Sequence, residues 1–199
     1  MNTFEVEIKF RVNNVDITVL ECQLQQQFGG TVFGEQVTES DAFFQHPCRN
    51  FVQTDECLRL RNRTFADGTP KHFLTYKGPK IDTSTKTRQE IEVPITEPEC
   101  VESMLVALGF CKAASVRKFR RRMALTVEHR HVDIVFDTLP DLPESSRLFV
   151  EMETIASDEE IEVCRSLILG IAKQLGLSEP IRDSYLKLVQ DYIGSSDSG

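Results

Sequence analysis

The sequence predicts an α+β fold in which a closed, eight-stranded antiparallel β-barrel carries helices packed on its outside. Two observations lead to this expectation. Segments that alternate between apolar and charged residues recur along most of the 199-residue chain, which is the period-two pattern of strands with one dry and one polar face. Segments with helical spacing stand between them, so helices are available to cover the apolar side of the sheet.

The first strand, predicted over residues 4–12, shows the alternation most clearly, because every second residue is charged. Its charged face consists of Glu5, Glu7, Lys9 and Arg11. A helix should follow, since Asn14 is a suitable N-cap and Gly29 with Gly30 a suitable stop.

Short strands separated by turn residues fill the next part of the chain. They are predicted near residues 31–38, 41–45, 57–63, 72–77 and 87–94. Asp67 and Gly68 supply the turn chemistry for a hairpin loop over residues 65–70. Gly78 and Pro79 begin a loop over residues 78–86.

The second half alternates between the two kinds of element. Strands are predicted near residues 113–127, 131–137 and 147–155, and helices near residues 97–108, 158–175 and 182–193. No internal repeat or long linker is visible, so we expect one domain over residues 1–193. The small polar residues 194–199 should form a disordered tail.

The composition excludes several classes of function. A net charge of -8 argues against nonspecific nucleic-acid binding, which needs a basic surface. No apolar run approaches the ~20 residues that cross a bilayer, and residues 1–5 show no secretory signal. The six cysteines are scattered and form no C-x-x-C pair, which favours free thiols. We therefore expect a cytoplasmic protein without nucleic-acid or membrane partners.

The charged strand faces point to a ligand. On any single strand such a face could simply meet solvent. Here the faces are almost wholly ionic on nearly every strand, and helices covering the apolar side would turn them inward. Buried charges are costly unless they are paired or bound to ions. Arg and Lys match phosphate oxygens, and carboxylates hold Mg²⁺ or Mn²⁺ that bridges to phosphates. The natural ligand is therefore a metal–polyphosphate.

Glu5, Glu7 and Lys9 form an E-x-E-x-K pattern that resembles the signature of the CYTH superfamily, the triphosphate tunnel metalloenzymes. The resemblance continues in order over about residues 4–190. Further segments that resemble the family are residues 41–44, 46–47, 54–61, 75–79, 88–92, 118–120, 136–137, 149–153 and 184–188. Taken together, these segments imply the tunnel fold.

The resemblance also implies roles for the ionic residues. Phosphates would be bound by Lys9, Arg59, Arg61, Lys77, Lys118, Arg120 and Arg122, among which Lys9, Lys118 and Arg120 would be catalytic. Mg²⁺ or Mn²⁺ would be held by Glu5, Glu7, Asp137, Glu151 and Glu153. Supporting positions would be taken by Glu90, Glu92 and Tyr185. Relatives are often dimers, so a homodimer is compatible with the resemblance.

Three functions agree with these residues. The first is a class IV-like (CyaB-type) adenylyl cyclase, which turns ATP into cyclic AMP and pyrophosphate. The second is a triphosphatase that releases orthophosphate from tripolyphosphate, thiamine triphosphate or a nucleoside triphosphate. The third is a noncatalytic polyphosphate- or nucleotide-binding module. Residues 46–61 favour the cyclase branch, whereas the proline-containing stretch at residues 140–143 departs from its pattern.

Overall fold

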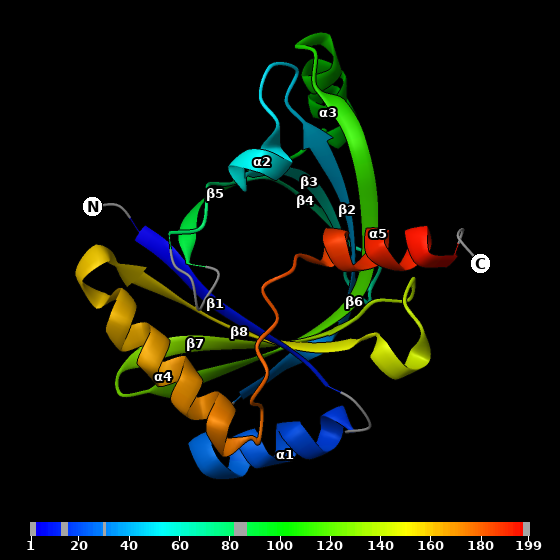
Figure 1. Ribbon diagram of the computed structural model, residues 1–199. Coiled ribbons are helices and arrows are strands. Elements are labelled where there is room, and N and C mark those ends of the chain that lie inside the picture. The colour runs from blue at the N-terminus through cyan, green and yellow to red at the C-terminus, as the bar shows by residue number, and fades with distance from the viewer. Residues whose placement is uncertain (1–2, 13–15, 30, 82–86, 197–199) are drawn as a thin grey trace.

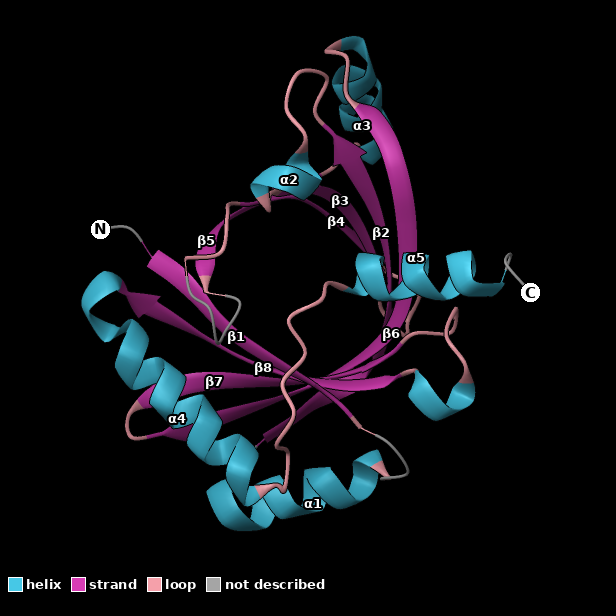
Figure 2. Cartoon of the chain, in the orientation of Figure 1, coloured by secondary structure: helices cyan, strands magenta, loops and turns pink. Residues whose placement is uncertain are grey.

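The computed structural model describes residues 3–12, 16–29, 31–81 and 87–196. Within them, antiparallel strands form a closed barrel in the order β1-β5-β4-β3-β2-β6-β7-β8, and helices lie outside it (Figures 1 and 2). The predicted fold class is confirmed. The strands are β1 (Thr3–Arg11), β2 (Thr31–Gln45), β3 (Cys57–Thr64), β4 (Pro70–Lys77), β5 (Arg88–Ile95), β6 (Cys111–Val127), β7 (Arg130–Thr138) and β8 (Leu148–Ser157).

The helices follow the predicted order, with a short extra helix before β3. They are α1 (Ile17–Phe28), α2 (Phe51–Thr54), α3 (Pro98–Ala107), α4 (Ile161–Gln174) and α5 (Tyr185–Ser196), and short 3₁₀ turns lie at Glu144–Ser146 and Asp158–Glu160. No helix in the described part of the chain is long and apolar enough to span a membrane.

The main hydrophobic core lies between the outside of the barrel and two helices. Outward-facing Ile8, Ile134 and Met152 of β1, β7 and β8 pack with Leu24 of α1 and Ile168 of α4. All five side chains are almost completely buried. In Figure 1, α4 runs obliquely along the outside of these strands, where it contacts β1 and β8, and α1 lies below, where it contacts β6. Since successive side chains of a strand point to opposite faces, burying the apolar residues outside turns the charged residues inward.

Two smaller clusters complete the packing. Leu105 of α3 covers Phe44 and Leu60 on the outer face of β2 and β3. The other cluster lies at one end of the barrel, where Tyr185 of α5 packs against Phe149 of β8. Helix α5 therefore contributes to the wall of the interior rather than to the outer core.

The start of α1 and the end of α5 differ from our expectations. Asp16 caps α1, because its carboxylate accepts a hydrogen bond of 2.9 Å from the backbone N–H of Thr18. The expected cap Asn14 lies outside the described residues. Gly29 ends the helix with a φ of 65°, as predicted. Helix α5 continues to Ser196, into the stretch we expected to be disordered, and residues 197–199 lie outside the described part.

Strand β2 is one long strand where two were predicted. It pairs with β6 from Thr31↔Ala124 to Gln45↔Cys111. The register of this pairing shifts once on each side of the centre of β2, as at a β-bulge. The two expected strands would have left residues 39–40 in a connection. Pairing on both sides holds them in the sheet, since Glu39 lies opposite Arg63 of β3 and Lys118 of β6.

Replacing Ile168 with alanine should destabilise the fold strongly, because the side chain is fully buried between α4 and the barrel. The cavity left behind should lower the free energy of unfolding by ~2–5 kcal/mol. Leu169→Ala is the matched control, since Leu169 follows on the same helix and is 40% exposed. Chemical denaturation of both variants checks this, and equal losses would contradict the placement of α4.

Candidate functional site

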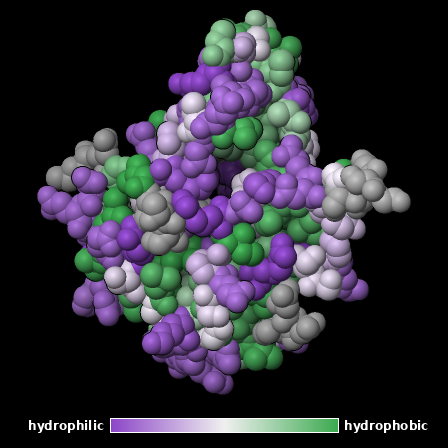
Figure 3. Space-filling model, viewed as in Figure 1, coloured by the Kyte–Doolittle hydropathy of each residue, from purple (hydrophilic) through white to green (hydrophobic). Residues whose placement is uncertain are grey.

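The barrel encloses a cavity of about 690 Å³ that is lined by the charged strand faces. Figure 3 shows the surface hollowed near the centre of the view, where hydrophilic side chains gather beside α5. The predicted residues that line the cavity are Glu5, Glu7, Lys9, Arg59, Arg61, Lys77, Glu90, Glu92, Lys118, Arg120, Arg122, Glu151, Glu153 and Tyr185. Asp137 lies behind them, fully buried against Arg120. The ionic rows thus point into an enclosed space.

Three carboxylates meet on the β1–β8 side of the cavity. Glu7 and Glu153 lie directly opposite each other on the paired strands, and Glu5 is the next inward residue along β1. One oxygen from each of Glu5, Glu7 and Glu153 can be chosen so that all three lie within 4.8 Å of one another. We call these residues the acidic triad.

The acidic triad concentrates negative charge, although Glu5 also pairs with Lys77. Burial, and after it the neighbouring Glu5 carboxylate, raises the pKa of Glu153 well above its usual value. A divalent cation would offset this repulsion, and carboxylate oxygens are the donors that Mg²⁺ and Mn²⁺ prefer. The residues present therefore fit such an ion.

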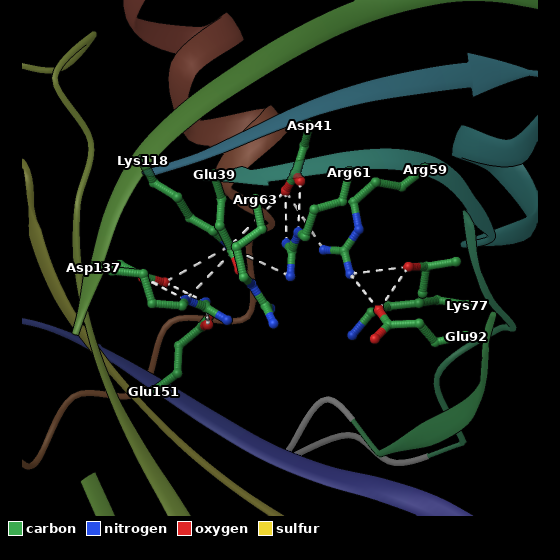
Figure 4. Close-up of polar contacts among 12 residues, drawn as sticks. Glu39, Asp41, Arg59, Arg61, Arg63, Lys77, Glu92, Lys118, Asp137 and Glu151 are labelled. Atoms are coloured by element: carbon green, nitrogen blue, oxygen red, sulfur yellow. Dashed lines mark hydrogen bonds and ion pairs between the residues drawn. The ribbon is translucent and has the colours of Figure 1, made fainter. Parts of the chain in front are cut away.

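The other two predicted metal ligands have cationic partners (Figure 4). Both oxygens of Asp137 accept hydrogen bonds from the guanidinium of Arg120. Glu151 also accepts from Arg120 at 2.9 Å, and it lies 3.3 Å from the ammonium of Lys9. This arrangement fixes Arg120 in place. The metal-binding role of Asp137 and Glu151 stays a prediction, and the structure does not bring them into the acidic triad.

A second group of cations comes from β3 and β4. Lys77 sits between the carboxylates of Glu5 and Glu90 and is 2.7 Å from Glu5. Arg59 is held more loosely, because its contacts with Asp41 and Glu92 measure 3.6 and 3.8 Å. Its Nε has no hydrogen-bond partner among the described residues. Arg59 therefore keeps donor capacity for a ligand.

Sequence reasoning missed two carboxylates of β2 as site residues. Glu39 and Asp41 point inward among the predicted phosphate-binding cations, and both are almost completely buried. Asp41 pairs with Arg61 through two hydrogen bonds of 2.7 Å. Their alternation was visible in the sequence. The prediction of two separate strands hid it, because Glu39 fell between them.

Tyr185 brings the C-terminal segment into the site. Its ring centroid lies 3.6 Å from the Lys9 ammonium and 5.3 Å from that of Lys118. Lys9 also donates a hydrogen bond of 3.1 Å to the backbone carbonyl of Asp183. Tyr185, for which a supporting role was predicted, thus lies beside two of the predicted phosphate-binding cations.

Arg122 lies at the periphery of the site. Its guanidinium pairs with Asp133 at 3.0 Å, and its side chain is 37% exposed. It shares the inward direction of Lys118 and Arg120 and lines the cavity with them. Its predicted phosphate contact stays a prediction.

Comparisons with known proteins agree with this geometry. The CYTH domain family matches residues 3–185. A protein of Methanocaldococcus jannaschii, provisionally named an adenylate cyclase, is 35% identical over 187 residues that cover 92% of this chain and 97% of the relative. The PH1819 protein of Pyrococcus horikoshii has a solved structure with a TM-score of 0.78 and 35% identity, covering 94% of this chain and 99% of that one.

A more distant solved structure shares the fold alone. It is a provisional adenylyl cyclase from Hippeastrum, described as having a dominant triphosphatase activity. Its TM-score is 0.60 at 16% identity, and the match covers 94% of this chain and 95% of that one.

Glu153→Gln should raise the melting temperature of the metal-free protein, because it removes one charge from the acidic triad. A carboxyl group with a raised pKa in the folded state binds more protons folded than unfolded, so it lowers stability as the pH rises above about 4.5. The gain should therefore be small at about pH 5 and larger at about pH 8, measured by thermal unfolding in EDTA.

Glu151→Gln is the control for that experiment, since it makes the same change on the same strand. Glu151 faces Lys9 and Arg120, so its loss should lower the melting temperature. A lower melting temperature for Glu153→Gln at about pH 8 would show that the acidic triad is not repulsive.

Proposed function

The chain belongs to the CYTH domain family, and on that premise we propose that it is a divalent-metal-dependent enzyme acting on the triphosphate of a nucleotide. The observation that carries this proposal is the acidic triad facing a wall of buried Lys and Arg in one enclosed cavity. Three carboxylates meet in the triad, where burial and their mutual repulsion raise the pKa of Glu153, and Arg59 retains a free donor among the described residues. A metal–triphosphate complex would complete both.

The favoured activity is that of a class IV-like adenylyl cyclase, which converts ATP to cyclic AMP and pyrophosphate. The 35%-identical relative with this provisional name supports it. The lining of the cavity supports it as well. Besides the ionic residues, the lining includes Phe43, Phe51, Leu58 and Leu186, and apolar side chains suit a nucleoside better than a further phosphate.

In this mechanism the chain acts mainly by positioning and electrostatic stabilisation. Arg59, Arg61 and Lys77 would hold the phosphates in line, and Lys9 and Arg120 would offset the charge that builds up as the bond to pyrophosphate breaks. A divalent ion bound at the acidic triad would supply Lewis-acid polarisation of the phosphate oxygens.

Lys118 is the candidate acceptor for the proton of the attacking ribose 3′-hydroxyl. Burial, followed by the charges of Arg120 and Arg61, lowers the pKa of its ammonium group. A lysine with a lowered pKa is neutral in a larger fraction of molecules, and the neutral amine can take a proton. In this reaction the 3′-oxygen bonds to the α-phosphorus, the bond to the pyrophosphate oxygen breaks, and the proton passes to Lys118.

A triphosphatase is the second candidate, supported by the activity described for the Hippeastrum neighbour. The same residues would serve, with water as the attacking group at the terminal phosphorus. The substrate would then be tripolyphosphate, thiamine triphosphate or a nucleoside triphosphate.

A product assay distinguishes the two reactions. Purified protein with Mg²⁺ or Mn²⁺ should convert ATP to cyclic AMP and pyrophosphate, and EDTA should abolish the conversion. Orthophosphate as the sole product, from ATP, tripolyphosphate or thiamine triphosphate, would instead establish the triphosphatase. Binding of these compounds without turnover would contradict both activities.

Glu7→Gln should lower the rate of turnover by roughly 100-fold or more, because it removes a charge from the proposed metal site. Glu102→Gln is the control, since Glu102 lies on the outer helix α3, where it pairs with Lys112. Steady-state kinetics at saturating Mg²⁺ checks this. Equal activity of the Glu7→Gln variant and the wild type would rule out the acidic triad as the metal site.

A further inference from the structure

Glu39 occupies an unusual place in the cationic wall. Its side chain has no solvent exposure, and four basic side chains converge on its carboxylate. Arg63 lies 2.6 Å from Oε1, whereas Arg61, Lys118 and Arg120 lie 3.1, 3.2 and 3.7 Å from Oε2. In Figure 4, Glu39 lies between Lys118 and the arginines of β3.

The two oxygens of this carboxylate are held differently. Oε1 accepts a hydrogen bond of 2.6 Å from Nε of Arg63. Oε2 makes no hydrogen bond of good geometry within the described part of the chain, although three cations surround it. Charge rather than directional bonding therefore holds Oε2, as it would hold a phosphate oxygen at the same place. Although burial opposes ionisation, these cations keep the pKa of Glu39 well below its usual value.

Two other inward carboxylates of this region each bind one arginine through both oxygens. Asp41 and Asp137 each use both oxygens on one guanidinium, that of Arg61 and Arg120 respectively. Such two-bond pairs orient an arginine and leave its outer edge available. Glu39 is instead shared among cations from β3 and β6, at the point where they face one another.

We propose that Glu39 is a built-in counter-anion, which stabilises the cationic wall in the empty tunnel and competes with a bound polyphosphate for the same cations. The inference rests on the proposed function, because it assumes that these cations bind phosphate. It makes Glu39 a positioning residue that sets affinity: it lowers the cost of assembling Lys118, Arg61, Arg63 and Arg120, and it weakens the binding of the ligand that they attract.

The test compares stability with binding in Glu39→Gln. Without ligand this variant should melt at least about 5 °C below the wild type, because the clustered cations lose their shared anion. It should nevertheless bind imidotriphosphate, a tripolyphosphate analogue whose P–N–P bridges resist hydrolysis, at least about threefold more tightly. Isothermal titration calorimetry at a fixed Mg²⁺ concentration measures the affinity, and thermal unfolding measures the stability.

Glu21→Gln is the matched control. Glu21 of α1 is also a buried carboxylate, and it pairs at 3.1 Å with Arg121, which lies outside the cavity lining. This variant should lose stability too, but its affinity for imidotriphosphate should stay within about twofold of the wild type, as expected for independent sites.

A second variant covers the case in which Glu39→Gln does not fold. Glu39→Asp keeps the charge and withdraws it by one methylene, so its affinity for imidotriphosphate should lie above that of the wild type. Binding by either variant that is equal to or weaker than that of the wild type overturns the inference and leaves the proposed function standing. Absence of binding by the wild type overturns both.

Discussion

Charged side chains can fill the interior of this barrel only if opposite charges meet them there, because an unpaired buried ion is too costly for a folded domain. Register between strands satisfies this requirement. Glu39 faces Lys118 across β2 and β6, and Arg120 faces Asp137 across β6 and β7. The apolar residues that alternate with the charged ones on β1, β7 and β8 are turned outward, where α1 and α4 cover them. The inside-out distribution of polarity and the outer helices are thus consequences of one constraint.

The balance of charge differs between the two sides of the cavity, and this difference gives the site its chemistry. Around Lys118 and Arg120, carboxylates of β2, β7 and β8 neutralise most of the positive charge. At the acidic triad three carboxylates meet, and burial together with the neighbouring Glu5 carboxylate raises the pKa of Glu153. A metal–triphosphate would suit both sides of the cavity, because its metal ion is a cation for the acidic triad and its phosphates are anions for the lysines and arginines.

The sequence was sufficient for the direction of nearly every charged side chain, since strand periodicity alone separates Glu5, Glu7 and Lys9 from their apolar neighbours. The sequence did not show which partner each charged side chain meets. Whether Glu151 meets a metal or Arg120 depends on pairings between strands far apart in the chain. Glu39 was missed because sheet pairing holds a segment that local propensity would leave as a connection. Tyr185 could be placed beside Lys9 only once the path of the C-terminal segment was known.

The most direct test of the central claim is anomalous diffraction from crystals grown with Mn²⁺ and imidotriphosphate. A manganese peak should lie among the carboxylates of Glu5, Glu7 and Glu153, with phosphate density extending from it toward Arg59 and Lys118. Manganese bound on the outer surface, or phosphate density outside the barrel, would contradict the claim.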